Sequence, residues 1–276
     1  MTRAEKARLF QALHARPGAF VIPNPWDAGT ARILAALGFE ALTTTSAGLA
    51  FALGRRDGAG LISREETLAN AKAIADATDL PVAADLENGF GDAPDIVAET
   101  IRLAARAGLA GGSIEDATGN PQRPIYDFNA AVERIAAAAE AAHALPDPFV
   151  LVGRAENFLH GRPDLDDTIA RLQAYEAAGA DALYAPGIVA PEDIRTICAS
   201  VSKPVNVVMG LRDGALSVAE LAELGVRRIS VGSTLVRAAL GAFIRAAREM
   251  RESGTFTFAR DAVSYADAND FMARRP

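Results

Sequence analysis

Acidic side chains follow one short apolar run of this 276-residue chain. The run from Pro81 to Ala84 leads into Asp85 and Glu87, and a glycine-rich turn then ends at Gly91. Residues two apart on an extended chain point to the same side, so the two carboxylates face one way. Buried carboxylates need a compensating partner, and a divalent cation is one. We interpret this stretch as one side of a metal site.

Other apolar runs end in polar or turn-forming residues as well. An arginine binds a carboxylate or phosphonate bidentately, and carboxylates with waters suit a hard cation such as Mg²⁺. Backbone N–H groups of a turn can bind an oxyanion. Together these groups predict a site for a small, oxygen-rich acid held on a metal. The residues at these ends are Thr45, Ser46, Ala47 and Gly48, then Asp57 in the following loop, Glu115 and Asp116, Arg154, Glu156 and Asn157, Asn206, and Gly232 and Ser233.

Each of these side chains also has a purely structural interpretation. The Asp85–Glu87 pair could cap the next helix, and Arg154 could serve only as an ion-pair partner. Trp26, the single tryptophan, could line the pocket or pack under the first helix of the barrel. The three histidines have no ligand spacing, which argues against a histidine-rich zinc site.

Short β-rich runs alternate with longer alanine-rich runs along the whole chain. Glycines at 38, 108, 179 and 225 end four of the helical runs, as helix C-caps do. The predicted strands are 19–23, 41–45, 82–84, 110–115, 149–153, 182–185, 205–209 and 228–231. The predicted helices are 28–37, 63–77, 95–107, 129–144, 167–178, 191–200, 217–224, 234–251 and 259–272, with loops at 46–61 and 117–125.

Eight strand–helix units of this length favour a single (β/α)8 barrel domain over residues 1–276, with 252–276 as a C-terminal helical extension. The apolar strands are those of a parallel sheet buried on both faces. A doubly wound sheet is the main alternative, but no Gly-x-Gly-x-x-Gly turn follows the first strand. In a parallel barrel the chemistry lies at the carboxyl ends of the strands, which are the ends listed above.

The composition excludes several classes of partner. A net charge of -7 and a pI near 5.1 argue against nucleic-acid binding, which needs a basic surface. No apolar run approaches the ~20 residues of a membrane span, and the charged N-terminus does not resemble a signal peptide. The one cysteine, Cys198, allows no internal disulfide, which predicts a reducing cytoplasm.

Five motifs resemble the isocitrate lyase / phosphoenolpyruvate mutase superfamily as a set. The resemblance spans Ile22 to Ser233 and implies a (β/α)8 barrel, Mg²⁺ with Mn²⁺ as the alternative, and substrates cleaved or formed beside a pyruvate-like enolate. It also implies a homodimer or a homotetramer in which the last barrel helix is swapped onto a neighbour. The motifs are Thr45-Ser-Ala-Gly48, Leu53-Gly-Arg-Arg-Asp57, Ala84-Asp-Leu-Glu-Asn-Gly-Phe-Gly91, Gly112-Ser-Ile-Glu-Asp116 and Gly153-Arg-Ala-Glu156.

Residue by residue, the resemblance implies a metal shell, partly through waters, of Asp85, Glu87 and Glu115. Asp57 is similar to a loop aspartate near the metal, and Arg154 to an arginine that anchors the substrate. Asp57, Arg154 and Glu115 are therefore the expected catalytic residues. The expected substrate-binding residues are Trp26, Thr45, Ser46, Ala47, Asp85, Arg154, Asn206 and Gly232.

One loop departs from the lyases of that superfamily. They carry a Lys-x-Cys-Gly-His loop after the fourth strand, whereas Ala117–Pro124 here has no lysine, cysteine or histidine. The usual route to isocitrate cleavage is thereby weakened. The first hypothesis is a Mg²⁺-dependent lyase or decarboxylase of a small 2-oxo or 2-hydroxy dicarboxylic acid. The alternatives are P–C chemistry on phosphonopyruvate, and a 2-oxo-acid binding protein with little turnover.

Overall fold

Eight parallel strands form one closed sheet in the computed structural model, which describes residues 1–210 and 216–273. Strands β2 to β8 each pair with their neighbours in the chain, and β1 pairs with β8, in the order β1-β8-β7-β6-β5-β4-β3-β2. The Thr43 amide donates to the Pro23 carbonyl at 3.1 Å, which joins the end of β1 to β2. The predicted (β/α)8 barrel is therefore confirmed. The strands are β1 Phe20–Val21, β2 Leu42–Thr43, β3 Val82–Asp85, β4 Gly111–Glu115, β5 Val150–Arg154, β6 Ala182–Tyr184, β7 Val205–Val208 and β8 Arg228–Ser230.

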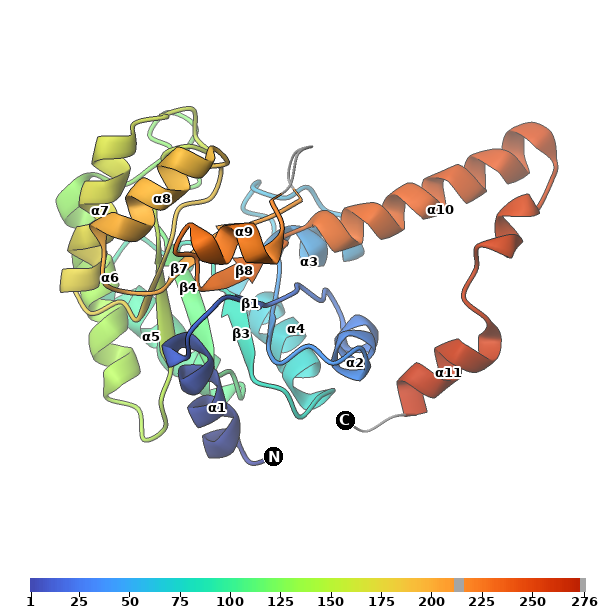
Figure 1. The fold of residues 1–276 in the computed structure, drawn as a ribbon, viewed down its shortest axis with the longest axis horizontal. Helices are drawn as coiled ribbons and strands as arrows, with labels where there is room; N and C mark the ends of the chain where they lie inside the picture. Colours follow the sequence, from blue (N-terminus) through green and yellow to red (C-terminus); the bar gives the residue numbers. More distant parts are fainter. Residues whose placement is uncertain (211–215, 274–276) are drawn as a thin grey trace.

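Most helices form a layer around this sheet (Figure 1). No helix of the described residues is both long and apolar enough to cross a membrane. The helices are α1 Arg3–Ala15, α2 Ala28–Ala36, α3 Ser46–Ala52, α4 Arg64–Asp76, α5 Pro94–Arg106, α6 Phe128–His143, α7 Leu165–Ala177, α8 Pro191–Ser200, α9 Val218–Glu223, α10 Thr234–Ser253 and α11 Tyr265–Ala273, with a short 3₁₀ turn at Thr257–Arg260.

Two hydrophobic cores hold the barrel together. The larger core lies between the outer face of the sheet and the helices. The smaller core closes the amino-terminal end of the barrel, where Phe10 and Leu13 of α1 pack on Phe20, Ala83 and Val150 at the beginnings of strands. Because one end is filled by apolar side chains, polar groups inside the barrel face the opposite, carboxyl-terminal end.

The strand register places one row of polar side chains inside the barrel. Glu115 is the register partner of Arg154, Arg154 of Tyr184, Tyr184 of Asn206, and Asn206 of Arg228. Register partners on parallel strands point to the same face of a sheet. Since Arg154 lines a cavity at the barrel mouth, the whole row points inward.

Two sequence-based expectations about irregular segments are corrected. The predicted loop 46–61 begins with a helix, α3, which Thr45 caps by accepting a hydrogen bond from Gly48 N at 3.2 Å. The predicted helix 259–272 is shorter, because only α11 is α-helical there. Neither difference moves a strand end, so the expected positions of the site residues are unaffected.

The C-terminal helix α10 leaves the barrel and projects from it, and the chain then returns so that α11 lies by α2 (Figure 1). The turn occurs at Gly254, which has a left-handed conformation with φ of 66°. Along α10 only Val236 is buried. The departure from the barrel therefore starts before residue 252, where the sequence analysis placed the extension. Exposed apolar side chains on α10 are Leu240, Phe243, Ile244 and Met250.

Candidate active site

Asp85 at the end of β3 is held in a fixed orientation by its neighbours. Its Oδ2 accepts a 2.9 Å hydrogen bond from the Ser46 hydroxyl, and Thr44 Oγ1 accepts from the Asp85 amide at 3.0 Å. Its Oδ1 also accepts from the Glu87 amide at 3.3 Å. Strand ends β2 and β3 are thus joined through the carboxylate that the sequence singled out.

Close packing positions the turn from Thr45 to Gly48 beside this carboxylate. A Cβ at Gly48 would lie 2.5 Å from Thr45 Cγ2 and 2.9 Å from Trp26 Cβ. Any side chain at this position would therefore push α3 away from the barrel mouth. Trp26 supports the turn from behind and does not line the mouth cavities, which agrees with the packing interpretation of this residue.

Arg154 at the end of β5 is surrounded by carboxylates. Its Nη1 lies 3.1 Å from Glu115 Oε2 and 3.5 Å from Asp85 Oδ1, and its Nε contacts Glu156 Oε1. Its guanidinium carbon lies 5.1 Å from the Tyr184 ring centroid. Three strand ends therefore converge on one guanidinium, as the sequence-based interpretation requires.

One positive charge does not balance the acids that surround it. Burial, and then Asp85 and Asp57, raise the pKa of Glu87 to about 7. Burial, and then Asp85, raise the pKa of Asp57. Burial also raises the pKa of Glu115, against the opposing effect of Arg154. Like charges in a poorly hydrated site disfavour ionisation, and a bound cation reverses that effect.

The donor set fits a hard divalent cation that keeps part of its water shell. Among residues 1–210 and 216–273, no three His, Cys, Asp or Glu side chains are arranged to hold a metal ion directly. Mg²⁺ commonly binds through one or two carboxylates, with waters and substrate oxygens completing an octahedron. Asp85 and Glu115, which both lie close to Arg154, could take this role, with Glu87 near Asp85.

The turn after β3 adopts an uncommon backbone conformation. Glu87 has φ of 48° and Phe90 has φ of 64°, and both are non-glycine residues in the left-handed region. The buried Arg134 supports this turn by donating to the carbonyl oxygens of Asn88 and Gly91. Strained backbone of this kind persists where surrounding contacts hold it, and it is enriched at functional sites.

Two contiguous cavities open at this end of the barrel. An inner cavity of about 180 Å³ lies within the barrel mouth. An outer cavity of about 1120 Å³ lies above it, between the turn after β3 and the loop after β4. Ser46, Asp57 and Arg154 line both cavities, so they lie at the junction where a ligand would contact both.

Most predicted site residues line one or both cavities. The inner cavity has Thr45, Ala47, Asp85, Asn206 and Gly232 in its wall. The outer cavity has Glu87 and Glu115. The sequence pattern therefore selects residues that the fold brings together, with Trp26 behind them.

Asp116 follows Glu115 in the chain but belongs to a different network. Its Oδ2 accepts from Arg171 Nη1 at 2.9 Å and from the Tyr175 hydroxyl at 2.7 Å, and its Oδ1 accepts from the Glu156 amide at 2.8 Å. These bonds lie between the sheet and the helices, because alternate strand residues point to opposite faces. Asp116 therefore holds the β4 and β5 ends in place and does not face the cavities.

Sequence reasoning missed two groups of cavity residues. Asn24 accepts from the amides of Val231 and Gly232 at 3.0 and 2.9 Å, and so fixes the end of β8. Its position in an Asn-Pro-Trp turn directly after the first strand was the available signal. Tyr184, Arg228 and Ser230 also line the inner cavity, but the strand register decides to which face of the sheet their side chains point.

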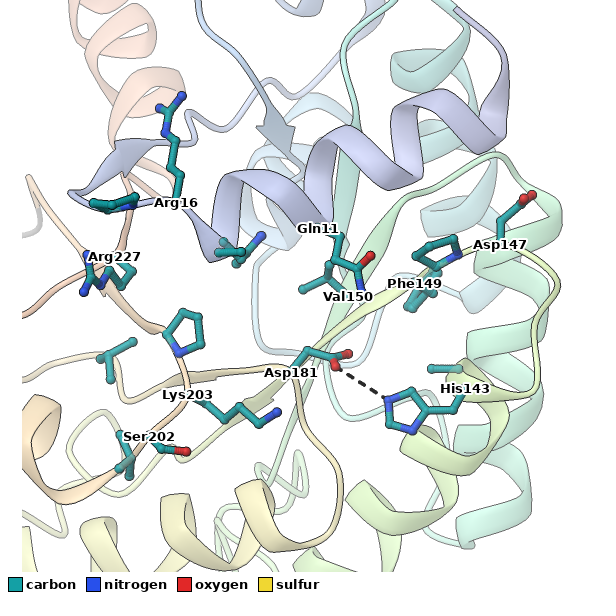
Figure 2. Close-up of a pocket in the computed structure, with 18 of the residues that line it drawn as sticks. Gln11, Arg16, His143, Asp147, Phe149, Val150, Asp181, Ser202, Lys203 and Arg227 are labelled. Carbon is teal, nitrogen blue, oxygen red and sulfur yellow. Dashed lines mark ion pairs between the residues drawn. The ribbon is translucent and has the colours of Figure 1, made fainter.

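A further cavity of about 960 Å³ opens at the amino-terminal end of the barrel (Figure 2). His143 Nε2 and Asp181 Oδ1 form an ion pair at 3.6 Å there, and Lys203 and Arg227 line the same cavity. None of the sequence-predicted site residues lines it. Enzymes of this fold place their chemistry at the carboxyl ends of the strands, so the mouth cavities remain the candidate active site.

The chain matches the family model described as phosphoenolpyruvate phosphomutase over residues 10–251. A solved structure from Burkholderia cenocepacia J2315, described provisionally as a lyase/mutase, has a TM-score of 0.96 and 62% sequence identity. That likeness covers 99% of this chain and 97% of the other.

Curated relatives include a decarboxylase and a lyase. The oxaloacetate decarboxylase of Pseudomonas fluorescens is 30% identical, covering 95% of this chain and 89% of the relative. The 2,3-dimethylmalate lyase of Eubacterium barkeri is 29% identical, covering 91% and 89%. Each relative is matched over nearly its full length, so the likeness includes the strand ends that carry the site residues.

Proposed function

Because this chain belongs to the phosphoenolpyruvate phosphomutase family, within the PEP mutase/isocitrate lyase superfamily, we propose that it is a Mg²⁺-dependent lyase. Its substrate would be a small 2-oxo or 2-hydroxy dicarboxylic acid, and the cleaved carbon–carbon bond would lie next to the oxo or hydroxy carbon. The family match and the lyase relatives confirm the resemblance to this superfamily that the sequence motifs indicated. The particular reaction, the metal and the site roles are the proposal.

One observation carries this proposal. A single guanidinium, that of Arg154, contacts Asp85, Glu115 and Glu156 at the junction of two cavities. The acids outnumber the cation there, which favours a bound divalent ion. When bound, Mg²⁺ would act as a Lewis acid that polarises the oxo group beside the bond that breaks.

The chain's own residues would orient the substrate and handle charge. Thr45, Ser46 and Ala47 would contact the carboxylate of the 2-oxo-acid group beside Asp85. Arg154 would stabilise the negative charge that develops as the bond breaks, because it is already fixed by ion pairs. Asp57, whose pKa burial raises, lines both cavities and is placed to exchange a proton with the product.

The test is turnover by purified protein with Mg²⁺ on oxaloacetate, 2-methylisocitrate, 2,3-dimethylmalate and phosphonopyruvate. We expect Mg²⁺-dependent release of a 2-oxo acid from one of the three carbon acids, and loss of that release on chelation. The Asp85→Ala variant should be inactive. Glu133→Gln, an exposed change on α6, should retain activity and is the matched control. Turnover that persists after metal removal would overturn the proposal.

P–C chemistry is the second candidate, and one observation favours it. Thr118, Gly119 and Asn120 of the loop after β4 line the outer cavity, so a polar amide is available there for a phosphoryl oxygen. Phosphorus NMR with phosphonopyruvate would show this reaction directly. Tight 2-oxo-acid binding without turnover of any of the four compounds would favour the third hypothesis, a binding protein.

Assembly through α10 is a further part of the proposal. The helix leaves the barrel with Phe243 69% exposed and Ile244 45% exposed. An apolar surface of this kind favours burial against another subunit. A homodimer or homotetramer with exchanged C-terminal helices, as the resemblance implies, would cover it.

A further inference from the structure

A second arginine lies inside the barrel, deeper than Arg154 and three strands away. Arg228 begins β8 and is the register partner of Asn206, so its side chain shares the inward face of the polar row. It lines the inner cavity and is 5% exposed. Its guanidinium carbon lies 5.8 Å from the ring centroid of Phe10, which closes the barrel below it. Arg228 therefore forms part of the inner end of the cavity.

Arg228 lacks the ion pairs that neutralise Arg154. Among the described residues, no carboxylate lies within ion-pair distance of its guanidinium, and its Nε and Nη1 have no hydrogen-bond partner. Burial lowers the pKa of Arg228 to about 10, so the group remains charged at neutral pH. An unpaired buried charge reduces stability, and a bound anion would offset that cost.

The groups around Arg228 are neutral and can form hydrogen bonds. The Asn206 amide donates to Ser230 Oγ at 3.0 Å, while its Oδ1 has no partner in the described part of the chain. Tyr184 lines the same space. The nearby His14 uses Nδ1 to contact the Phe10 carbonyl oxygen, and burial together with Arg228 lowers the His14 pKa to about 3. His14 is therefore uncharged and adds no second cation.

We propose that Arg228, with Asn206, Ser230 and Tyr184, binds the second carboxylate of the substrate. This inference rests on the proposed function, which places the 2-oxo-acid end of the same molecule beside Ser46, Asp85 and Arg154. The inner cavity of about 180 Å³ connects the two ends and has the size of a short diacid. A guanidinium binds a carboxylate through charge-assisted hydrogen bonds, and two nitrogens of Arg228, Nε and Nη1, are buried without a partner among the described residues.

The consequence is selectivity for diacids over monoacids of the same length. Two matched pairs test it: L-malate against 2-hydroxybutyrate, and 2-oxoglutarate against 2-oxovalerate. In each pair a methyl group replaces the distal carboxylate. Calorimetry with Mg²⁺ would measure each dissociation constant for the wild type, Arg228→Met and Arg228→Lys. We expect Arg228→Met to weaken binding of at least one diacid tenfold or more, with its monoacid changed less than about threefold.

Thermal unfolding of the ligand-free protein separates this role from a structural one. Methionine replaces a buried, unpaired charge, so Arg228→Met should unfold at the same temperature as the wild type or higher. Lower stability with unchanged diacid selectivity would overturn the proposal, as would equal weakening of diacid and monoacid. Arg228→Lys keeps the charge but lacks the planar guanidinium, and it should retain part of the selectivity.

A second variant keeps the test decisive if Arg228→Met does not fold. Asn206→Asp is isosteric and places a negative charge on the register partner of Arg228. The new pair should raise the unfolding temperature and remove the preference for diacids, because the subsite is then already neutralised. Unchanged selectivity in Asn206→Asp would count against the subsite.

The two proposals fail in different ways. Diacid binding that depends on Arg228, with no turnover of any panel compound, would overturn the proposed reaction and support the subsite. Metal-dependent turnover with matched diacids and monoacids bound equally would overturn the subsite and support the reaction.

Discussion

Arg154 Nη1 lies 3.1 Å from Glu115 Oε2, and the two residues are register partners on β5 and β4. The ion pair therefore follows from the sheet itself: two side chains on neighbouring strands face the same cavity at the same height. Glu115 is among the acids that we propose to hold the metal. In the proposed site, this pair would link Arg154, as the cation that anchors the substrate, to the metal across one strand spacing.

Loss of Asp85 should remove metal-dependent ligand binding without unfolding the barrel. Its carboxylate accepts hydrogen bonds from Ser46 and contacts Arg154, but its side chain is not part of either hydrophobic core. We expect Asp85→Ala to weaken Mg²⁺-dependent 2-oxo-acid binding at least a hundredfold in calorimetry, with unchanged circular dichroism. Unaltered binding would refute the site assignment, and Glu133→Gln is the control.

Replacement of Arg154 should cost stability as well as activity. Arg154→Met leaves Glu115 and Glu156 without their cation, and removing one partner of a buried pair costs about 3–5 kcal/mol of unfolding free energy. Chemical denaturation would measure this loss. Because a divalent ion would neutralise part of the same charge, Mg²⁺ should restore some of the stability of the variant. Equal stability with and without Mg²⁺ would argue against a metal at this position.

Glu87 should make the metal-free protein less stable as the pH rises. Its pKa is raised from 4.5 to about 7 in the folded state, so folding favours the protonated form. The stability that protonated Glu87 contributes to the folded state is complete below about pH 4.5 and is lost as the pH rises through about 7. Glu87→Gln should not show this component in thermal unfolding between these pH values. An identical pH dependence in wild type and variant would contradict the assignment.

Mg²⁺ affinity should also increase as the pH rises through about 7. A carboxylate must be deprotonated to bind a cation, so metal binding to Glu87 releases a proton. Calorimetry in buffers of different ionisation enthalpy would count the protons released. The release should be smaller in Glu87→Gln, and its persistence would assign the proton to another group.

Asp116 should prove structural although it is the neighbour of Glu115. Asp116→Asn removes the charge that pairs with Arg171 and should lower the unfolding free energy by about 3–5 kcal/mol. The Mg²⁺ dissociation constant of the folded variant should stay within about threefold of the wild-type value, because the side chain faces the helices. A large loss of metal affinity at full stability would place Asp116 in the site instead.

A charge on the exposed face of α10 should reduce the oligomeric state. Phe243→Glu replaces the most exposed of the large apolar side chains on this helix, whereas Glu252→Gln changes an exposed polar residue near its end. We expect light scattering to show a smaller species for Phe243→Glu and no change for Glu252→Gln. A monomeric wild type would overturn the proposed assembly.

The sequence alone determined the strand order, the barrel and the position of the acidic strand ends. Local signals were sufficient for these features, because apolar runs mark buried strands and glycine caps mark helix ends. Each of the motifs around Asp85, Glu115 and Arg154 is also one continuous stretch of the chain, and the barrel brings the ends of consecutive strands together. The local sequence of each segment was therefore sufficient to predict where its strand end lies.

Only the tertiary structure decided which neighbouring side chain faces which layer. Glu115 and Asp116 both carry carboxylates, yet strand alternation directs one to the cavities and the other to Arg171. Arg228 gave no sequence signal, since its lack of a partner depends on residues from other strands. α3 and the departure of α10 likewise depend on packing, because a seven-residue helix and an exposed apolar helix are not stable in isolation. Contacts between distant segments set the face of the sheet to which a side chain points and the partner that it contacts. Those contacts exist only in the folded chain.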